Sequence, residues 1–112
     1  MPIGSEDAAR AFYNGVLGLP EILKPADLFA RSGGVWFAAG ALQVHLGGEA
    51  GFVPAKKAHP ALTVDGFDEY TGVLVARGIA VTADVMVAGR KRAAIADPFG
   101  NRIELIEQLR SP

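Results

Sequence analysis

His45, His59 and Glu104 are the residues whose types and positions best suit chemistry in this sequence. They are the chain's only two histidines and a glutamate, and each lies in a segment where apolar and polar residues alternate. Such alternation predicts β-strands, with apolar side chains on one face and the candidate residue on the other, over residues 42–46, 59–64 and 102–107. Two neutral imidazoles and an anionic carboxylate suit a divalent transition metal and leave positions for water or substrate.

A structural role is the alternative for the same three residues. A single histidine in a strand is commonly a surface or hydrogen-bonded residue, and Glu104 could be a solvated strand glutamate. His59-Pro60 could simply begin a strand, since proline is tolerated at that position. The spacing alone leaves both interpretations open.

Four further residues are weaker candidates for contact with a substrate. Trp36 and Phe99 could wall an apolar pocket, and burial in the core is the alternative for both. Arg90 and Arg92 lie on either side of Lys91 and could attract an anionic substrate, with a solvated basic turn as the alternative. Residues 97–101, Asp-Pro-Phe-Gly-Asn, predict a turn and are assigned no chemistry as a motif.

Two helices with matching ends are predicted to support these strands. The first begins after a Ser5 cap and ends at Gly18, and the second begins after an Asp65 cap and ends at Gly78. Each runs thirteen residues from its cap to its terminating glycine, and the second is offset from the first by sixty positions. The match indicates a duplicated unit.

Each predicted helix is followed by three strand-like segments, which are residues 28–31, 35–38 and 42–46 in the first half and 79–87, 92–96 and 102–107 in the second. Only the second helix is preceded by a predicted strand, at 59–64. The second half therefore follows the order βαβββ. The first half follows αβββ, because only Met1 to Gly4 precede its helix cap.

Composition excludes several classes of function. Eleven basic and twelve acidic residues give a formal net charge of −1, so nothing favours binding to nucleic acid or to an anionic membrane. The absence of cysteine excludes disulfides and thiolate ligands. No apolar run approaches the ~18 residues of a membrane helix, and the first residues do not resemble a signal peptide. We therefore expect a single domain over residues 1–112 of a cytoplasmic protein.

The paired modules and two sequence motifs resemble the vicinal oxygen chelate superfamily of glyoxalases, bleomycin-resistance proteins and extradiol dioxygenases. The motifs are Ala-Arg-Ala-Phe-Tyr-Asn-Gly-Val-Leu-Gly-Leu at 9–19 and Asp-Pro-Phe-Gly-Asn-Arg-Ile-Glu-Leu at 97–105. The resemblance implies an α+β fold in which two βαβββ modules, about 1–50 and 58–110, form an open, cupped mixed sheet with helices outside. Here the first strand of module 1 is missing.

The resemblance also implies a ligand set. His59 matches the ligand that opens the second module, Glu104 matches the carboxylate on its last strand, and His45 falls on the last strand of the first module. The fourth ligand has no counterpart. Either the chain is truncated, or another chain supplies a strand, or the site is degenerate. The metal would be Zn, Ni, Mn or Fe, and Glu104 would be the catalytic group that moves the proton.

Two functions follow as expectations from the resemblance. The first is a glyoxalase-like, metal-dependent isomerase, lyase or dioxygenase that acts on a small oxygen-bearing substrate. The alternative is a metal-free protein that sequesters a small molecule, as bleomycin-resistance proteins do. We also expect a homodimer, because a missing strand leaves unpaired backbone groups at a sheet edge.

Overall fold

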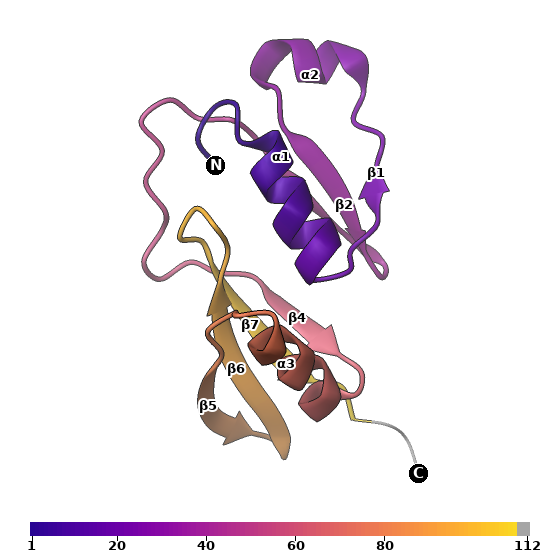
Figure 1. Ribbon diagram of the computed structural model, residues 1–112, viewed down its shortest axis with the longest axis vertical. Coiled ribbons are helices and arrows are strands. Elements are labelled where there is room, and N and C mark those ends of the chain that lie inside the picture. The colour runs from indigo at the N-terminus through magenta and orange to yellow at the C-terminus, as the bar shows by residue number, and fades with distance from the viewer. Residues whose placement is uncertain (110–112) are drawn as a thin grey trace. The chain divides into compact units, whose positions relative to one another are not determined.

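The structure is a computed structural model that describes residues 1–109, apart from the side chain of Ser32. The chain divides into two compact units, Met1–Pro54 and Ala55–Pro112, which are described separately below (Figure 1). Both units combine helices with a β-sheet, which confirms the predicted α+β class. Within residues 1–109, no helix has the length and apolar character needed to cross a membrane.

The first unit contains two helical segments and a three-stranded antiparallel sheet in the order β1-β2-β3. Its elements are α1 (Glu6–Ala9), which continues as a π-helix (Arg10–Val16), β1 (Glu21–Ile22), α2 (Ala26–Ser32), β2 (Val35–Ala39) and β3 (Leu42–Leu46). The first predicted helix is therefore present, with its second half wound as a π-helix. Its buried residues Phe12 and Tyr13 pack toward the sheet, and the rings of Tyr13 and Phe37 stack with centroids 5.4 Å apart.

The strand predicted at 28–31 is wrong, because these residues belong to helix α2. The segment from Ala26 to Ser32 contains no β-branched residue, and alanine, leucine and arginine favour helices. Pro25 immediately precedes the first helical residue, a place that proline tolerates. A short apolar run of this kind has no periodicity that separates helix from strand.

The N-terminal residues contact the segment that follows β3, where the amino group of Met1 donates to the carbonyl of Gly47 at 3.1 Å. Pro2 and Glu49 form an isolated parallel bridge, and the amide of Glu49 donates to the carbonyl of Met1 at 2.9 Å. In the second unit, the first strand also pairs in parallel with the last one, along Ala61–Val64 and Glu104–Glu107. Among the described residues, the outer edge of β3 itself, Leu42–Leu46, has no partner strand.

The second unit has the order βαβββ that the sequence predicts. Its elements are β4 (Ala61–Val64), α3 (Phe67–Ala76), β5 (Thr82–Val87), β6 (Arg90–Ala96) and β7 (Arg102–Glu107). The strands lie in the order β4-β7-β6-β5, with β4 parallel to β7 and the other pairs antiparallel. Helix α3 begins after Gly66, which has a left-handed backbone, so the predicted Asp65 cap is off by one residue.

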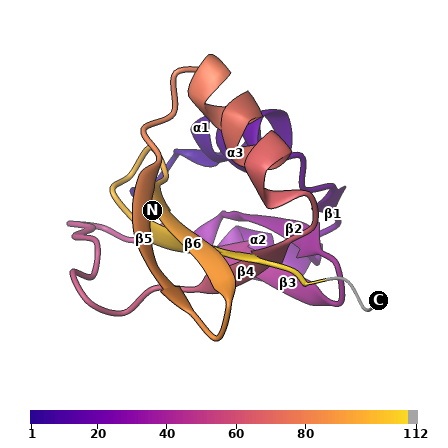
Figure 2. The same cartoon turned by 90° about the horizontal axis from the view of Figure 1, so that it is seen from below.

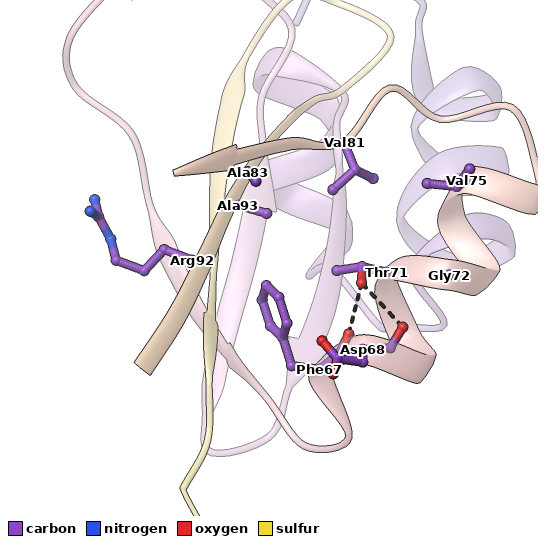
Figure 3. Close-up of a pocket in the computed structure, with 9 residues that line it drawn as sticks. All are labelled: Phe67, Asp68, Thr71, Gly72, Val75, Val81, Ala83, Arg92 and Ala93. Atoms are coloured by element: carbon purple, nitrogen blue, oxygen red, sulfur yellow. Dashed lines mark hydrogen bonds between the residues drawn. The ribbon is translucent and has the colours of Figure 1, made fainter. Parts of the chain in front are cut away.

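The two faces of the second sheet differ in character. Helix α3 covers one face (Figures 1 and 2), where it packs against a core made by the buried residues Phe67, Leu74, Ala93, Ile95, Ile103 and Leu105. The alternation of side chains places Thr63, Arg92 and Glu104 on the opposite face. Figure 3 shows Arg92 pointing away from α3. These three polar residues therefore lie on the face that the helix leaves open.

Candidate ligand-binding site

Glu104 lies at the centre of the open face of the second sheet. It is opposite Ala61 of β4 on one side and Ala94 of β6 on the other. Both neighbours are small, so they leave room for longer side chains to reach the carboxylate from the next positions along each strand. On one side that side chain is His59, two residues before Ala61, and on the other it is Arg92, two residues before Ala94.

Arg92 holds Glu104 by two hydrogen bonds. Its Nε donates to Oε2 at 3.0 Å and its Nη2 donates to Oε1 at 3.1 Å, which is the paired geometry that guanidinium and carboxylate favour. Glu104 is 7% exposed. The hydrogen bond from Arg92, followed by that from His59, lowers the pKa of Glu104 to about 2. The carboxylate is therefore ionised at neutral pH and already neutralised by a protein cation.

The other donors of Arg92 are also engaged. Its Nη1 donates to the carbonyl of Val85 at 3.2 Å, and Nη2 lies 3.6 Å from Oδ2 of Asp84. The hydrogen bond with Glu104 is the largest cause of a raised Arg92 pKa. Asp84 also lies 3.9 Å from Nη2 of Arg102. Arg92 is thus fixed on several sides and has no free donor pair to offer a ligand.

His59 contacts two oxygen acceptors. Its Nε2 lies 3.1 Å from Oε1 of Glu104, and its Nδ1 lies 2.8 Å from the carbonyl oxygen of Lys57. Both partners accept hydrogen bonds, so the two contacts are made together when both ring nitrogens carry a proton. In that form, His59 adds a second positive group to the Glu104 carboxylate.

A cavity of about 400 Å³ opens beside this group. It is lined by Thr63, Val87, Ala88, Arg90, Arg92, Glu104 and Ile106. Its volume lies within the range of small-molecule sites, and its walls combine apolar side chains with a few charged groups, as such sites do. A second cavity, of about 360 Å³, lies on the other face between α3 and the sheet and is mostly apolar (Figure 3).

His45 and Trp36 lie together in the first unit. They face each other across β2 and β3, and their rings stack with centroids 3.6 Å apart and planes 2° apart. The Nε2 of His45 also lies 2.8 Å from Oε1 of Gln43. His45 therefore belongs to an aromatic pair in a different unit from His59 and Glu104.

Phe99 and Arg90, the remaining predicted contacts, lie in different places. Phe99 belongs to the turn between β6 and β7, where its amide donates to Oδ1 of Asp97 at 2.9 Å, and it does not line the 400 Å³ cavity. Asp97 also accepts from the backbone and the side chain of Asn101, both at 2.8 Å, so this carboxylate organises the predicted turn. Arg90, in contrast, does line the cavity.

As arranged, the residues of the second unit do not fit a divalent cation. Arg92 engages both oxygens of Glu104 and places a fixed positive charge where a metal ion would have to bind. Over residues 1–109, no three or more histidine, aspartate or glutamate side chains form a group that could hold a metal. The metal site at His45, His59 and Glu104 stays a prediction, and the contacts of Glu104 argue against it.

The sequence interpretation missed several residues of this site. Thr63 and Ile106 share the alternating face with Glu104, so their position could have been read from the strand pattern. Asp84 and Val87 could not, because the pairing of β5 with β6 is irregular between these two residues. Arg92 was recognised as a candidate, but as a substrate contact rather than as the partner of Glu104.

Comparison with known proteins identifies the family. A model of the glyoxalase/bleomycin resistance protein/dioxygenase superfamily matches residues 1–105. The chain belongs to this superfamily. Members of the superfamily typically use divalent metals and bind small molecules. A search of curated proteins gives no match.

Solved structures are similar to nearly the whole chain. A protein assigned to the glyoxalase family from Bacillus anthracis is 43% identical, with a TM-score of 0.91 over 97% of this chain and 88% of that one. A lactoylglutathione lyase from Agrobacterium tumefaciens is 27% identical, with a TM-score of 0.72 over 96% and 88%. An antibiotic-binding protein from Streptomyces sp. CB03234 is 22% identical, with a TM-score of 0.73 over 97% and 91%, and shows the fold alone.

Proposed function

We propose that this chain is a metal-independent small-molecule-binding protein, with the 400 Å³ cavity of its second unit as the ligand site. One observation carries the proposal. Arg92 forms hydrogen bonds of 3.0 and 3.1 Å with both oxygens of Glu104, the carboxylate expected to bind a metal. A carboxylate that is neutralised in this way needs no metal ion to balance its charge. A metal ion could bind the carboxylate only by displacing the guanidinium, which would break the ion pair.

The superfamily by itself does not choose between binding and catalysis. The solved structures similar to this chain include a lactoylglutathione lyase and an antibiotic-binding protein. The choice has to be made from the residues of the site. Here the candidate catalytic group, Glu104, is nearly buried and is held in place by Arg92 and His59.

Metal analysis tests the first part of the proposal. Protein purified without a metal-affinity tag should contain less than about a tenth of an equivalent of Zn, Ni, Mn or Fe, an expectation based on the paired carboxylate. Calorimetric titration with each of the four ions should show no saturable uptake. One equivalent of bound metal that is lost in Glu104→Gln would overturn the proposal.

A ligand screen tests the second part. Fragments that bind the wild-type protein, detected by NMR, should shift the amide signals of residues that line the cavity. Thr63→Phe should block them, because Thr63 lines the cavity and is exposed on β4. Thr82→Phe is the matched control, since Thr82 is an exposed strand threonine outside the cavity lining. Fragments that bind the Thr63→Phe variant as they bind the wild type would show that the ligand site lies elsewhere.

A metal-dependent isomerase, lyase or dioxygenase is the second candidate. It is favoured by the 3.1 Å contact between His59 and Glu104, two of the three expected ligands. It would require Arg92 to release the carboxylate. Uptake of one metal ion that is lost in both Glu104→Gln and His59→Ala, with the fold retained in both variants, would favour this candidate.

A further inference from the structure

The charges that line the cavity do not cancel. Arg92 and Glu104 neutralise each other through their two hydrogen bonds. Arg90 also lines the cavity, and among the described residues its guanidinium has neither a hydrogen bond nor an ion pair. Arginine remains charged at any physiological pH, so the cavity has one positive charge without a partner.

Three carboxylates of this unit contact residues other than Arg90. Asp84 lies beside Arg92 and Arg102, and Asp68 on α3 pairs with Nζ of Lys91 at 2.7 Å. Glu107 accepts from the backbone amide of Lys91 at 3.1 Å. Among the described residues, no carboxylate of this unit forms an ion pair with Arg90.

The rest of the cavity wall is largely apolar. Val87 is 54% exposed, and Ala88 and Ile106 continue the same lining. An exposed valine beside an unpaired guanidinium offers two different contacts within one small cavity. A ligand that used both would bury apolar surface and complete a charge-assisted ion pair at the same time.

We propose that the cavity binds a small molecule with one acidic group, which pairs with Arg90, and an apolar body that lies over Val87 and Ile106. Carboxylates and phosphonates share the oxygen geometry that a guanidinium binds with two parallel hydrogen bonds. This inference rests on the proposed function, because it names the class of ligand for the same cavity.

Three matched probes test the inference in the full chain. 1-Naphthoate carries an apolar ring system and a carboxylate, 1-naphthylphosphonate carries the same rings and a phosphonate, and 1-naphthamide is the neutral counterpart. NMR titration should show shifts at residues 87–90 and 106, with at least one of the acids binding about tenfold more tightly than the amide, as a charged hydrogen bond contributes. The stronger of the two acids indicates the natural acidic group.

Arg90→Met should remove that advantage while leaving the weak binding of 1-naphthamide unchanged. Arg90→Lys should restore part of it, since lysine retains the charge without the planar fork. Arg77→Met is the control, because Arg77 follows α3 and its loss changes the net charge by the same amount. Thermal unfolding of each variant checks that the fold is retained.

The inference is overturned if the acids bind no better than the amide, if Arg90→Met binds them as the wild type does, or if neither acid binds at millimolar concentration. Its failure is separable from that of the proposed function. If the protein binds metal through Glu104 but its acid binding still depends on Arg90, only the metal-independent function is contradicted. If the protein binds no metal and its cavity binds the acids and the amide equally well, only the inference is contradicted.

Discussion

Glu104 and Arg92 form an ion pair in which each charge offsets the energetic cost of burying the other. Glu104 is nearly buried, and 19% of the Arg92 side chain is exposed to solvent. Removing one member leaves the other's charge without its partner, which costs more than removing both. The pair therefore has the energetic behaviour of a single structural unit.

A double-mutant cycle should reveal this coupling. We expect Arg92→Met to lower the free energy of unfolding more than the double variant Arg92→Met/Glu104→Gln does, because the double variant leaves no unpaired carboxylate. Urea unfolding of the wild type, both single variants and the double variant gives the coupling energy. Additive effects of the two substitutions would contradict the pairing.

Acid should weaken the fold through Glu104. The pKa of Glu104 is about 2 in the folded protein, below its ordinary value of 4.5, so folding favours the ionised form. The resulting stabilisation is complete above about pH 4.5 and is lost as the pH falls toward 2. Urea unfolding between pH 2 and 6 should show this loss in the wild type and a smaller one in Glu104→Gln. Glu69→Gln, at an exposed position on α3, should behave as the wild type.

At the scale of elements, the connection between α2 and β2 depends on a close backbone approach. A Cβ atom at Gly34 would lie 2.3 Å from the carbonyl oxygen of Leu46, and the φ of Gly34 is +100°. The amide of Gly34 also donates to Oε1 of Glu6 at 3.0 Å, which ties this connection to α1. That hydrogen bond lowers the pKa of Glu6.

Gly34→Ala should therefore destabilise the protein by about 3 kcal/mol or more, since it adds a backbone clash to the strain of a positive φ. Gly40→Ala is the matched control. Gly40 also has a positive φ, of +60°, but nothing lies within 4 Å of the position of its Cβ. We expect it to cost about 1–2 kcal/mol from strain alone. Equal losses of unfolding free energy in the two variants would show that the clash is relieved.

Much of the second unit could be predicted from the alternation of apolar and polar residues and from the residues that end helices and strands. The pattern placed His59 and Glu104 on one face of a sheet, and the glycines and the turn at 97–101 marked the ends of elements. The first unit was harder because α2 is a short apolar segment and β1 has only two residues. Neither is long enough for the spacing of its apolar residues to distinguish a helix from a strand.

The contacts within the site depend on register, which the sequence does not display. Arg92 reaches Glu104 because β6 and β7 pair Ala94 with Glu104, and a shift by one residue would turn Arg92 to the other face. Val87, which lines the cavity, follows the irregular pairing of β5 with β6 between Asp84 and Val87. Residue types therefore suggested metal ligation, whereas the strand register joins the same carboxylate to a guanidinium.

For the whole molecule, the free edge of β3 bears on association. Among the described residues, Leu42–Leu46 pairs with β2 on one side only, and Leu42 is 62% exposed. Unpaired backbone groups beside an exposed leucine favour addition of a strand from another copy. The dimer predicted from the sequence would protect both features.

We expect sedimentation equilibrium at micromolar concentration to give about twice the chain mass of 11.7 kDa. Leu42→Lys should weaken the dimer, because a charge on an edge strand opposes pairing with a second edge. Leu23→Lys is the matched control, since Leu23 is 93% exposed in the same unit but lies outside the strands. A chain that sediments at 11.7 kDa at every concentration would contradict the dimer. If both substitutions weaken the dimer equally, the interface does not lie at β3.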